Sequence, residues 1–199
     1  MSECGTIADR SEFQPAMGQS AVSQVCAHWS ALRIDGELPR RSKVNPKDLG
    51  AALPHVFLAE LVTPRVARLR ICGHKVEDLM GMDMRGMPLS VLFEGKARAA
   101  ITEAVEQAGM GARVMLSLES VGSFGQKTVS ATLALLPLTD DTGRVTRILG
   151  VLDHQGEIGR APRSFTLAEP VLDAPANPPK RPSLAPKRPA LRVINGGRA

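Results

Sequence analysis

The chain has 199 residues, of which 43% are apolar, and its net charge at neutral pH is +5. This length allows one ordinary domain with tails, or two very small domains. No apolar run is long enough for a transmembrane helix, and the first 19 residues lack the apolar core of a signal peptide. Three cysteines without a close pair argue against a disulfide framework, so we expect a cytoplasmic protein.

The positive charge is concentrated toward the C-terminal end of the chain. Residues 161–199 hold seven basic and two acidic residues, which account for the whole net charge, and eight of the fifteen prolines. Such a composition buries too little apolar surface to offset the entropy of ordering the chain. We therefore expect residues 1–19 to form a flexible leader, residues 20–160 the folded domain, and residues 161–199 a disordered tail rich in Pro, Lys and Arg.

The folded part shows helix and strand patterns in a definite order. Apolar residues at helical spacing predict an amphipathic helix over residues 20–33, and Asn45-Pro46 begins a short helix that Pro54 stops. Further elements are strands over 55–62 and 65–72, helical segments over 74–87 and 89–109, strands over 112–119, 127–138 and 145–154, and hairpin loops over 121–125 and 139–143. This order predicts an α+β domain whose five-stranded antiparallel sheet is covered by helices on one face.

The apolar stripe of the first helix has two interpretations. Val22, Val25 and Trp29 lie on one side of the helix. The stripe could pair two copies of the chain, or it could pack on the chain's own sheet. Both alternatives stay open at this point.

We find no catalytic or metal site in the sequence. The GxSxG and HExxH patterns are absent. The histidines (His28, His55, His74 and His154) are isolated, and the pair Cys72 and His74 lacks the further ligands that zinc needs. The methionines Met80, Met82, Met84 and Met87 could bind Cu(I), but Met is also a common filler of cores and pockets, which we favour. We therefore expect no enzyme activity and no bound metal.

Several short motifs between residues 21 and 155 match one family. They are Trp29-x-x-Leu32-Arg33, Pro39-x-Arg41-Ser42-x-x-x-Pro46, Leu53-Pro54-His55-Val56-Phe57-Leu58, Arg68-Leu69-Arg70-Ile71-Cys72-Gly73-His74, and the turn from Met80 to Leu89. With the element order, these residues resemble a PAS domain, and in particular the short single-PAS bacterial proteins best known in alphaproteobacteria. Met80 stands where the family often has an aromatic residue, and Met84-Arg85 replaces the usual Leu-Thr. The resemblance implies a module that binds small ligands or partners, and it carries no catalytic residue.

The resemblance also implies a cavity between the helical segment 74–109 and the sheet. Its expected lining is Leu69, Ile71, Val76, Leu79, Met80, Met84, Leu92, Val114, Leu116 and Leu135. These side chains are aliphatic or thioether, whereas a flavin or haem needs stacking surface, a reactive Cys in a helix or an axial His. We therefore expect no coloured cofactor, and either a small apolar ligand or a filled core.

Two functions remain as hypotheses. The first is a regulatory sensory or protein-interaction PAS module without a fused output domain, which acts through a signalling protein that the sequence does not identify; a homodimer also stays open. The alternative is a protein that binds nucleic acid or a membrane surface through its basic C-terminal tail.

Overall fold

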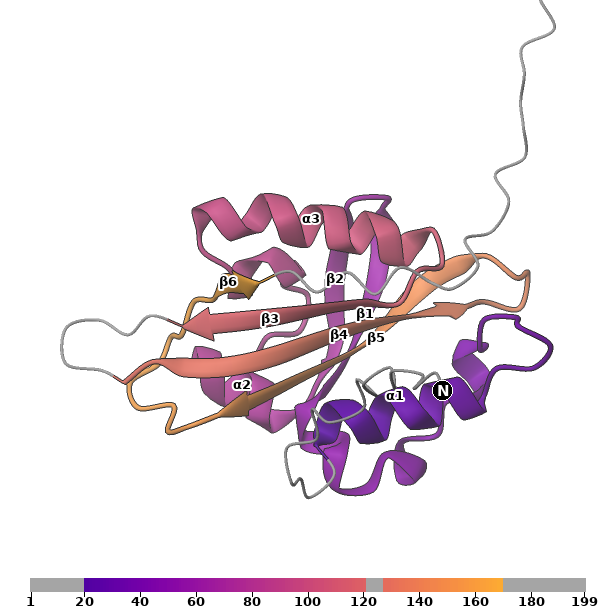
Figure 1. Cartoon of the computed structure of the whole chain (residues 1–199). Coiled ribbons are helices and arrows are strands. Elements are labelled where there is room, and N and C mark those ends of the chain that lie inside the picture. Colours follow the sequence, from indigo (N-terminus) through magenta and orange to yellow (C-terminus); the bar gives the residue numbers. More distant parts are fainter. Residues whose placement is uncertain (1–19, 121–126, 170–199) are drawn as a thin grey trace, which may run out of the picture.

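The structure, a computed structural model, describes residues 20–120 and 127–169. Its centre is a six-stranded antiparallel sheet with the strand order β2-β1-β5-β4-β3-β6 (Figure 1). The strands are β1 (Val56–Thr63), β2 (Val66–Cys72), β3 (Val114–Ser120), β4 (Val129–Thr139), β5 (Val145–Gln155) and β6 (Thr166–Glu169). The predicted leader, the predicted loop over 121–125 and the part of the predicted tail after residue 169 lie outside the described residues. The predicted α+β class with an antiparallel sheet is confirmed, although β6 adds a sixth strand to the five that the sequence predicted.

Helices cover both faces of the sheet, whereas the sequence predicted one covered face. One face carries α1 (Ala21–Ala31) and the 3₁₀ helices η1 (Arg41–Lys43) and η2 (Pro46–His55). The other face carries α2 (His74–Met80), η3 (Leu89–Leu92) and α3 (Gly95–Gly109). Figure 1 shows α1 and α3 on opposite sides of the strands. We call the α3 side the interior face and the α1 side the outer face. No helix among the described residues is long and apolar enough to cross a membrane.

The apolar stripe of helix α1 packs against the chain's own sheet. Val22, Val25 and Trp29 are buried against the outer face of β4 and β5. The indole Nε1 of Trp29 donates a hydrogen bond to the Pro137 carbonyl at 2.9 Å, which fixes the helix on the sheet. Packing on the chain's own sheet is therefore the alternative that the structure supports, and the stripe is not exposed for pairing two copies.

Two helical segments differ in extent from the prediction. The expected helix over 89–109 is divided into η3 and α3, because Phe93 and Glu94 between them have extended backbone angles. Asn45 caps η2 as predicted, since its Oδ1 accepts a hydrogen bond from the Lys47 amide at 3.1 Å. Helix η2 bends at Gly50, where φ is +47°, and it continues past Pro54.

The folded domain extends beyond the predicted boundary at residue 161. Phe165 is fully buried, its amide donates to the Leu92 carbonyl at 2.9 Å, and its carbonyl accepts from the Glu94 amide at 3.0 Å. Strand β6 then pairs with β3 at the edge of the sheet. The predicted boundary is wrong because it was placed where the proline and charge content rises. Phe165 and the four-residue strand β6 follow that point and still belong to the fold.

Candidate functional site

The predicted pocket residues meet, with one exception, on the interior face of the sheet. All of these are buried and belong to one apolar cluster: Leu69, Val76, Leu79, Met80, Met84, Leu92, Val114, Leu116 and Leu135. They come from α2, η3 and the loop between them, and from β2, β3 and β4. The sequence therefore identified the inward side of these elements correctly, although burial alone does not show a cavity.

Ile71 is the exception, and its predicted place in the pocket is wrong. Its side chain is 56% exposed and belongs to the outer face, whereas Leu69 on the same strand is fully buried. The pairing of β1 with β2 shifts between Leu58 and Ala59, so that Ala59 pairs with Leu69 but Leu58 pairs with Ile71. This β-bulge breaks the strict alternation on which the prediction depended.

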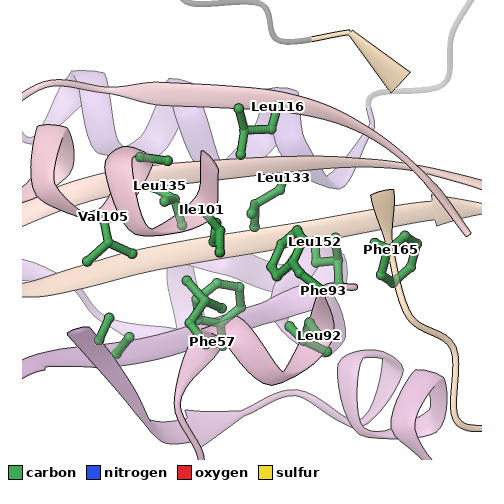
Figure 2. Packing of buried hydrophobic residues seen from close by; sticks show 14 of the residues in the cluster. Phe57, Leu92, Phe93, Ile101, Val105, Leu116, Leu133, Leu135, Leu152 and Phe165 are labelled. Carbon is green, nitrogen blue, oxygen red and sulfur yellow. The ribbon is translucent and has the colours of Figure 1, made fainter. Parts of the chain in front are cut away.

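Phenylalanine side chains fill the space between the interior face and its helices. Phe57, Phe93 and Phe165 are each at most 1% exposed, and Figure 2 shows them packed with Ile101 and the surrounding leucines. The ring of Phe57 lies directly on the Cα of Gly150 in β5, where any side chain would collide with it. Sequence reasoning missed these aromatic residues, although a glycine within an apolar strand often marks such a close approach.

A filled interior bears on the question of a cofactor. A flavin or haem ring would have to occupy the volume that these phenylalanines and aliphatic side chains already pack. Cys72 lies at the end of β2, and its pKa is raised to about 12 by burial, with smaller contributions from the Glu77 and Asp83 charges. A thiol held protonated in this way is a poor nucleophile. The described residues therefore do not fit a flavin or haem.

The candidate metal ligands do not converge. Among residues 20–120 and 127–169 there is no group of three or more His, Cys, Asp or Glu side chains that could hold a metal ion. The methionines also separate, because Met80 and Met84 are buried in the interior cluster whereas Met82 is 50% exposed. Their distribution favours the interpretation of Met as a core residue.

The outer face holds an apolar groove that the sequence did not predict. It has a volume of about 530 Å³ and is lined by residues from η1, η2, the start of β1, the end of β2, the start of α2 and the middle of β5. Its apolar walls include Val44, Leu49, Leu53, Leu58, Ile71 and Leu149, and the nitrogen groups of Arg41 and His74 also line it. We call this feature the outer groove. The sequence signal for this groove lies in the two motifs between Pro39 and Leu58, because their apolar residues continue beyond Pro54, where the predicted helix stops.

Close backbone packing shapes one part of the outer groove. The Gly73 amide donates to the Val56 carbonyl at 2.8 Å, and a side chain at Gly73 would collide with the Pro54 carbonyl. The turn from β2 into α2 is therefore pressed against the end of η2. Gln24 of α1 donates through Nε2 to the Leu49 carbonyl at 3.1 Å, which ties η2 to the first helix.

Arg41 gives the groove a cationic group that is not neutralised nearby. Its side chain is half-buried, and Nη1 makes one long hydrogen bond of 3.4 Å to the Val44 carbonyl. In the part of the chain that the structure describes, no carboxylate lies within ion-pair distance of this guanidinium, and no Asp or Glu lines the groove. The groove can therefore accept an apolar molecule and offers a donor for an anionic group.

A cluster of ionisable groups lies beside the groove, where η2 meets β5. Asp153 accepts a hydrogen bond from the Ala21 amide at 3.0 Å, and its other oxygen lies 3.5 Å from Nδ1 of His55. The ring of His154 lies 6.1 Å from that of His55, and both nitrogens of His154 are buried without a hydrogen-bond partner in the structure. Burial, helped by the charges of His55 and Lys75, holds the pKa of His154 below its ordinary value.

Comparison with known proteins agrees with this architecture. The family model described as "PAS domain" matches residues 17–153. The search of curated proteins found no match. Among solved structures, the Rhodobacter sphaeroides LOV protein is 15% identical, with 52% of this chain and 60% of that chain covered and a TM-score of 0.41. A structure described as "Flavin Analogue Sheds Light on Light-Oxygen-Voltage Domain Mechanism" is 19% identical, with 56% and 84% covered and a TM-score of 0.41. An RNA-binding light-oxygen-voltage receptor is 19% identical, with 61% and 36% covered and a TM-score of 0.40.

This chain thus spans less than two thirds of the length of the first of these proteins. Because the family model covers more than half of its residues, and because the sheet and helices follow the order that the sequence motifs implied, the chain belongs to the PAS domain family.

Proposed function

We propose that this chain is a regulatory sensory module that acts by binding a partner protein, and that it is not itself an enzyme. Membership of the PAS family supports the sensory part of the proposal. The filled interior favours a module that works through its surface over one that depends on a large prosthetic group inside the fold.

The observation that carries the proposal is the composition of the outer side of β1 and β2. Val62, Val66 and Ile71 are exposed on these two neighbouring strands at the edge of the sheet. Between them lie two arginines, Arg68 and Arg70. We call these five residues the hairpin face. Exposed apolar side chains next to arginines are compatible with a protein interface, where Arg is enriched.

Ion pairs link charged side chains in the middle of this surface. Glu60 contacts Arg70, and its other carboxylate oxygen lies 2.9 Å from Nη1 of Arg147 on β5. The hydrogen bond from Arg70 and the charges of both arginines lower the pKa of Glu60. These pairs are partly exposed, so they contribute little to stability, but they bring Arg70 and Arg147 together around one carboxylate on this surface.

The test is affinity capture with the full chain from an extract of the cells that produce it, followed by titration of the purified captured protein. The double variant Val62→Glu/Val66→Glu should weaken that binding by about tenfold or more, as expected for residues at the centre of an interface. Ile34→Glu is the matched control, because Ile34 is 72% exposed and lies outside the hairpin face. Equal binding by the wild type and both variants would contradict the proposal.

The basic tail supports a second candidate function. Residues 170–199 hold six basic and one acidic residue, so they carry the excess positive charge of the chain. Such a segment favours binding to nucleic acid or to an anionic membrane surface. Retention on heparin that persists in the full chain but is lost in a chain ending at residue 169 would support this function. Equal retention of the two chains would exclude it.

A further inference from the structure

We propose that the outer groove binds an amphiphilic carboxylate, that is, an aliphatic chain with a single carboxylate group of the fatty-acid type. This ligand would be the molecule that the sensory module detects, so its regulatory meaning rests on the function proposed above. Binding itself does not depend on the partner and can be measured on the chain alone.

The size and the walls of the groove fit the aliphatic part of such a ligand. Its volume of about 530 Å³ lies within the usual range of small-molecule sites. Leu53 and Ile71 remain 42% and 56% exposed at the groove, so a ligand there would cover apolar surface that the fold leaves open to water. Each methylene group buried in this way raises affinity by about fourfold.

The charge of the groove fits the other end of the ligand. Arg41 brings a guanidinium charge to the groove, and no acidic side chain lines it. Its planar guanidinium can donate two parallel hydrogen bonds to a carboxylate, and such charge-assisted bonds are among the strongest that side chains make. A neutral apolar molecule or an amine would leave this half-buried charge without a partner, so the groove favours an anion.

The position of the groove suggests how ligand binding would be communicated. Arg41 lies on η1, whereas Ile71 lies on β2 and belongs both to the outer groove and to the hairpin face. A ligand that reaches from Arg41 to Ile71 would therefore change one of the side chains that a partner meets. The apolar patch of a docked protein is the competing occupant of the same groove, and so is a second copy of this chain.

The experiment is a titration of the full chain with decanoate, kept below the concentration at which it forms micelles, and followed by calorimetry and by amide chemical shifts. Decanol has the same chain length without the charge and serves as the second probe. The variants are Arg41→Met, which removes the charge, and Ile71→Gln, which makes the wall polar. Arg40→Met is the matched control, because Arg40 is the adjacent, exposed arginine and does not line the groove.

We expect saturable binding of decanoate that Arg41→Met weakens by about tenfold or more, as expected for loss of a charge-assisted hydrogen bond. Decanol binding should be unchanged by Arg41→Met, Ile71→Gln should weaken both probes, and Arg40→Met should change neither. Urea midpoints of the variants check that all of them fold. Absent binding, or binding that Arg41→Met and Ile71→Gln leave unchanged, would overturn the proposal. A dimer in sedimentation that Ile71→Gln dissociates would overturn it in favour of a second copy. These outcomes can be told apart from failure of the proposed function. If the groove binds decanoate but affinity capture yields no partner, only the proposed partner binding is refuted.

Discussion

The end of the folded domain can be tested by truncation, because the structure and the composition of the sequence disagree about it. The composition places the boundary at residue 161, whereas the structure places Phe165 in the interior and β6 in the sheet. A chain that ends at residue 169 should keep the stability of the full chain. A chain that ends at residue 161 should lose a large part of it.

The expected loss can be worked out from the contacts of residues 163–169. Removing a buried Phe side chain such as Phe165 costs about 3–5 kcal/mol. Besides the pairing of β6 with β3, three backbone hydrogen bonds are lost: Arg163 to Leu79 at 2.7 Å, Phe165 to Leu92 at 2.9 Å and Glu94 to Phe165 at 3.0 Å. Each contributes about 1 kcal/mol net. The total of roughly 6–8 kcal/mol is comparable to the whole free energy of unfolding of a typical domain, about 5–15 kcal/mol.

The assay is urea denaturation of the full chain, of the chains ending at residues 169 and 161, and of the full-length variant Phe165→Ala. We expect the first two to have the same midpoint, Phe165→Ala to be less stable by about 3–5 kcal/mol, and the shortest chain to be largely unfolded without urea. Limited proteolysis should likewise leave a core that ends near residue 169. A chain ending at residue 161 that is within about 1 kcal/mol of the full chain would refute the reasoning, since that is the scale of a single hydrogen bond.

Three further predictions concern the interior and the ionisable cluster. Gly150→Ala should destabilise the domain by about 1–3 kcal/mol or more in urea denaturation, because the new Cβ collides with Phe57; a double variant with Phe57→Ala whose loss equals the sum of the single losses would show that the two positions do not interact. The pKa of His154 is lowered in the folded state, so the unfolded chain binds more protons as the pH falls below the ordinary value of 6.5. The urea midpoint should therefore decline between about pH 7 and pH 5, and His154→Leu should reduce that decline; an identical decline in the variant would assign it to other groups. The purified protein should be colourless, and an absorbance band at about 400–450 nm would contradict the packing of the interior, since flavin and haem absorb there.

Most of the fold could be predicted from the sequence because its signals are local. The alternation of residues in β2, the Asn-Pro start of η2 and the apolar stripe of α1 each specify an element without reference to the rest of the chain. The face of the sheet that α1 covers is not specified by such a local signal. It depends on the contact between Trp29 and the Pro137 carbonyl, which are more than 100 residues apart in the sequence. No local pattern encodes that contact, so the sequence predicted one covered face where the structure has two.

The candidate site was less accessible to sequence reasoning, for a related reason. The outer groove is assembled from η1, η2 and three strands, and no local pattern in the sequence marks Arg41 as its cationic group. The bulge in the pairing of β1 with β2 moved Ile71 from the interior to the groove. A bulge inserts one residue into the pairing of two strands, and period-two reasoning assumes that no residue is inserted. Leu69, which precedes the bulge on the same strand, keeps the inward position that the alternation predicts.

The placement of Ile71 ties the two proposals together through thermodynamic linkage. If the same side chain takes part in ligand binding and in partner binding, each binding event changes the free energy of the other by the same amount. A ligand that covers Ile71 without adding contacts to the partner would weaken partner binding, and the partner would weaken ligand binding by an equal factor. Titrating decanoate into the chain with and without saturating partner therefore gives the sign of the regulation. If the affinity for decanoate differs between the free and the partner-bound chain, the outer groove and the hairpin face are coupled. A factor of one would mean that the groove and the hairpin face bind independently, although they share a residue.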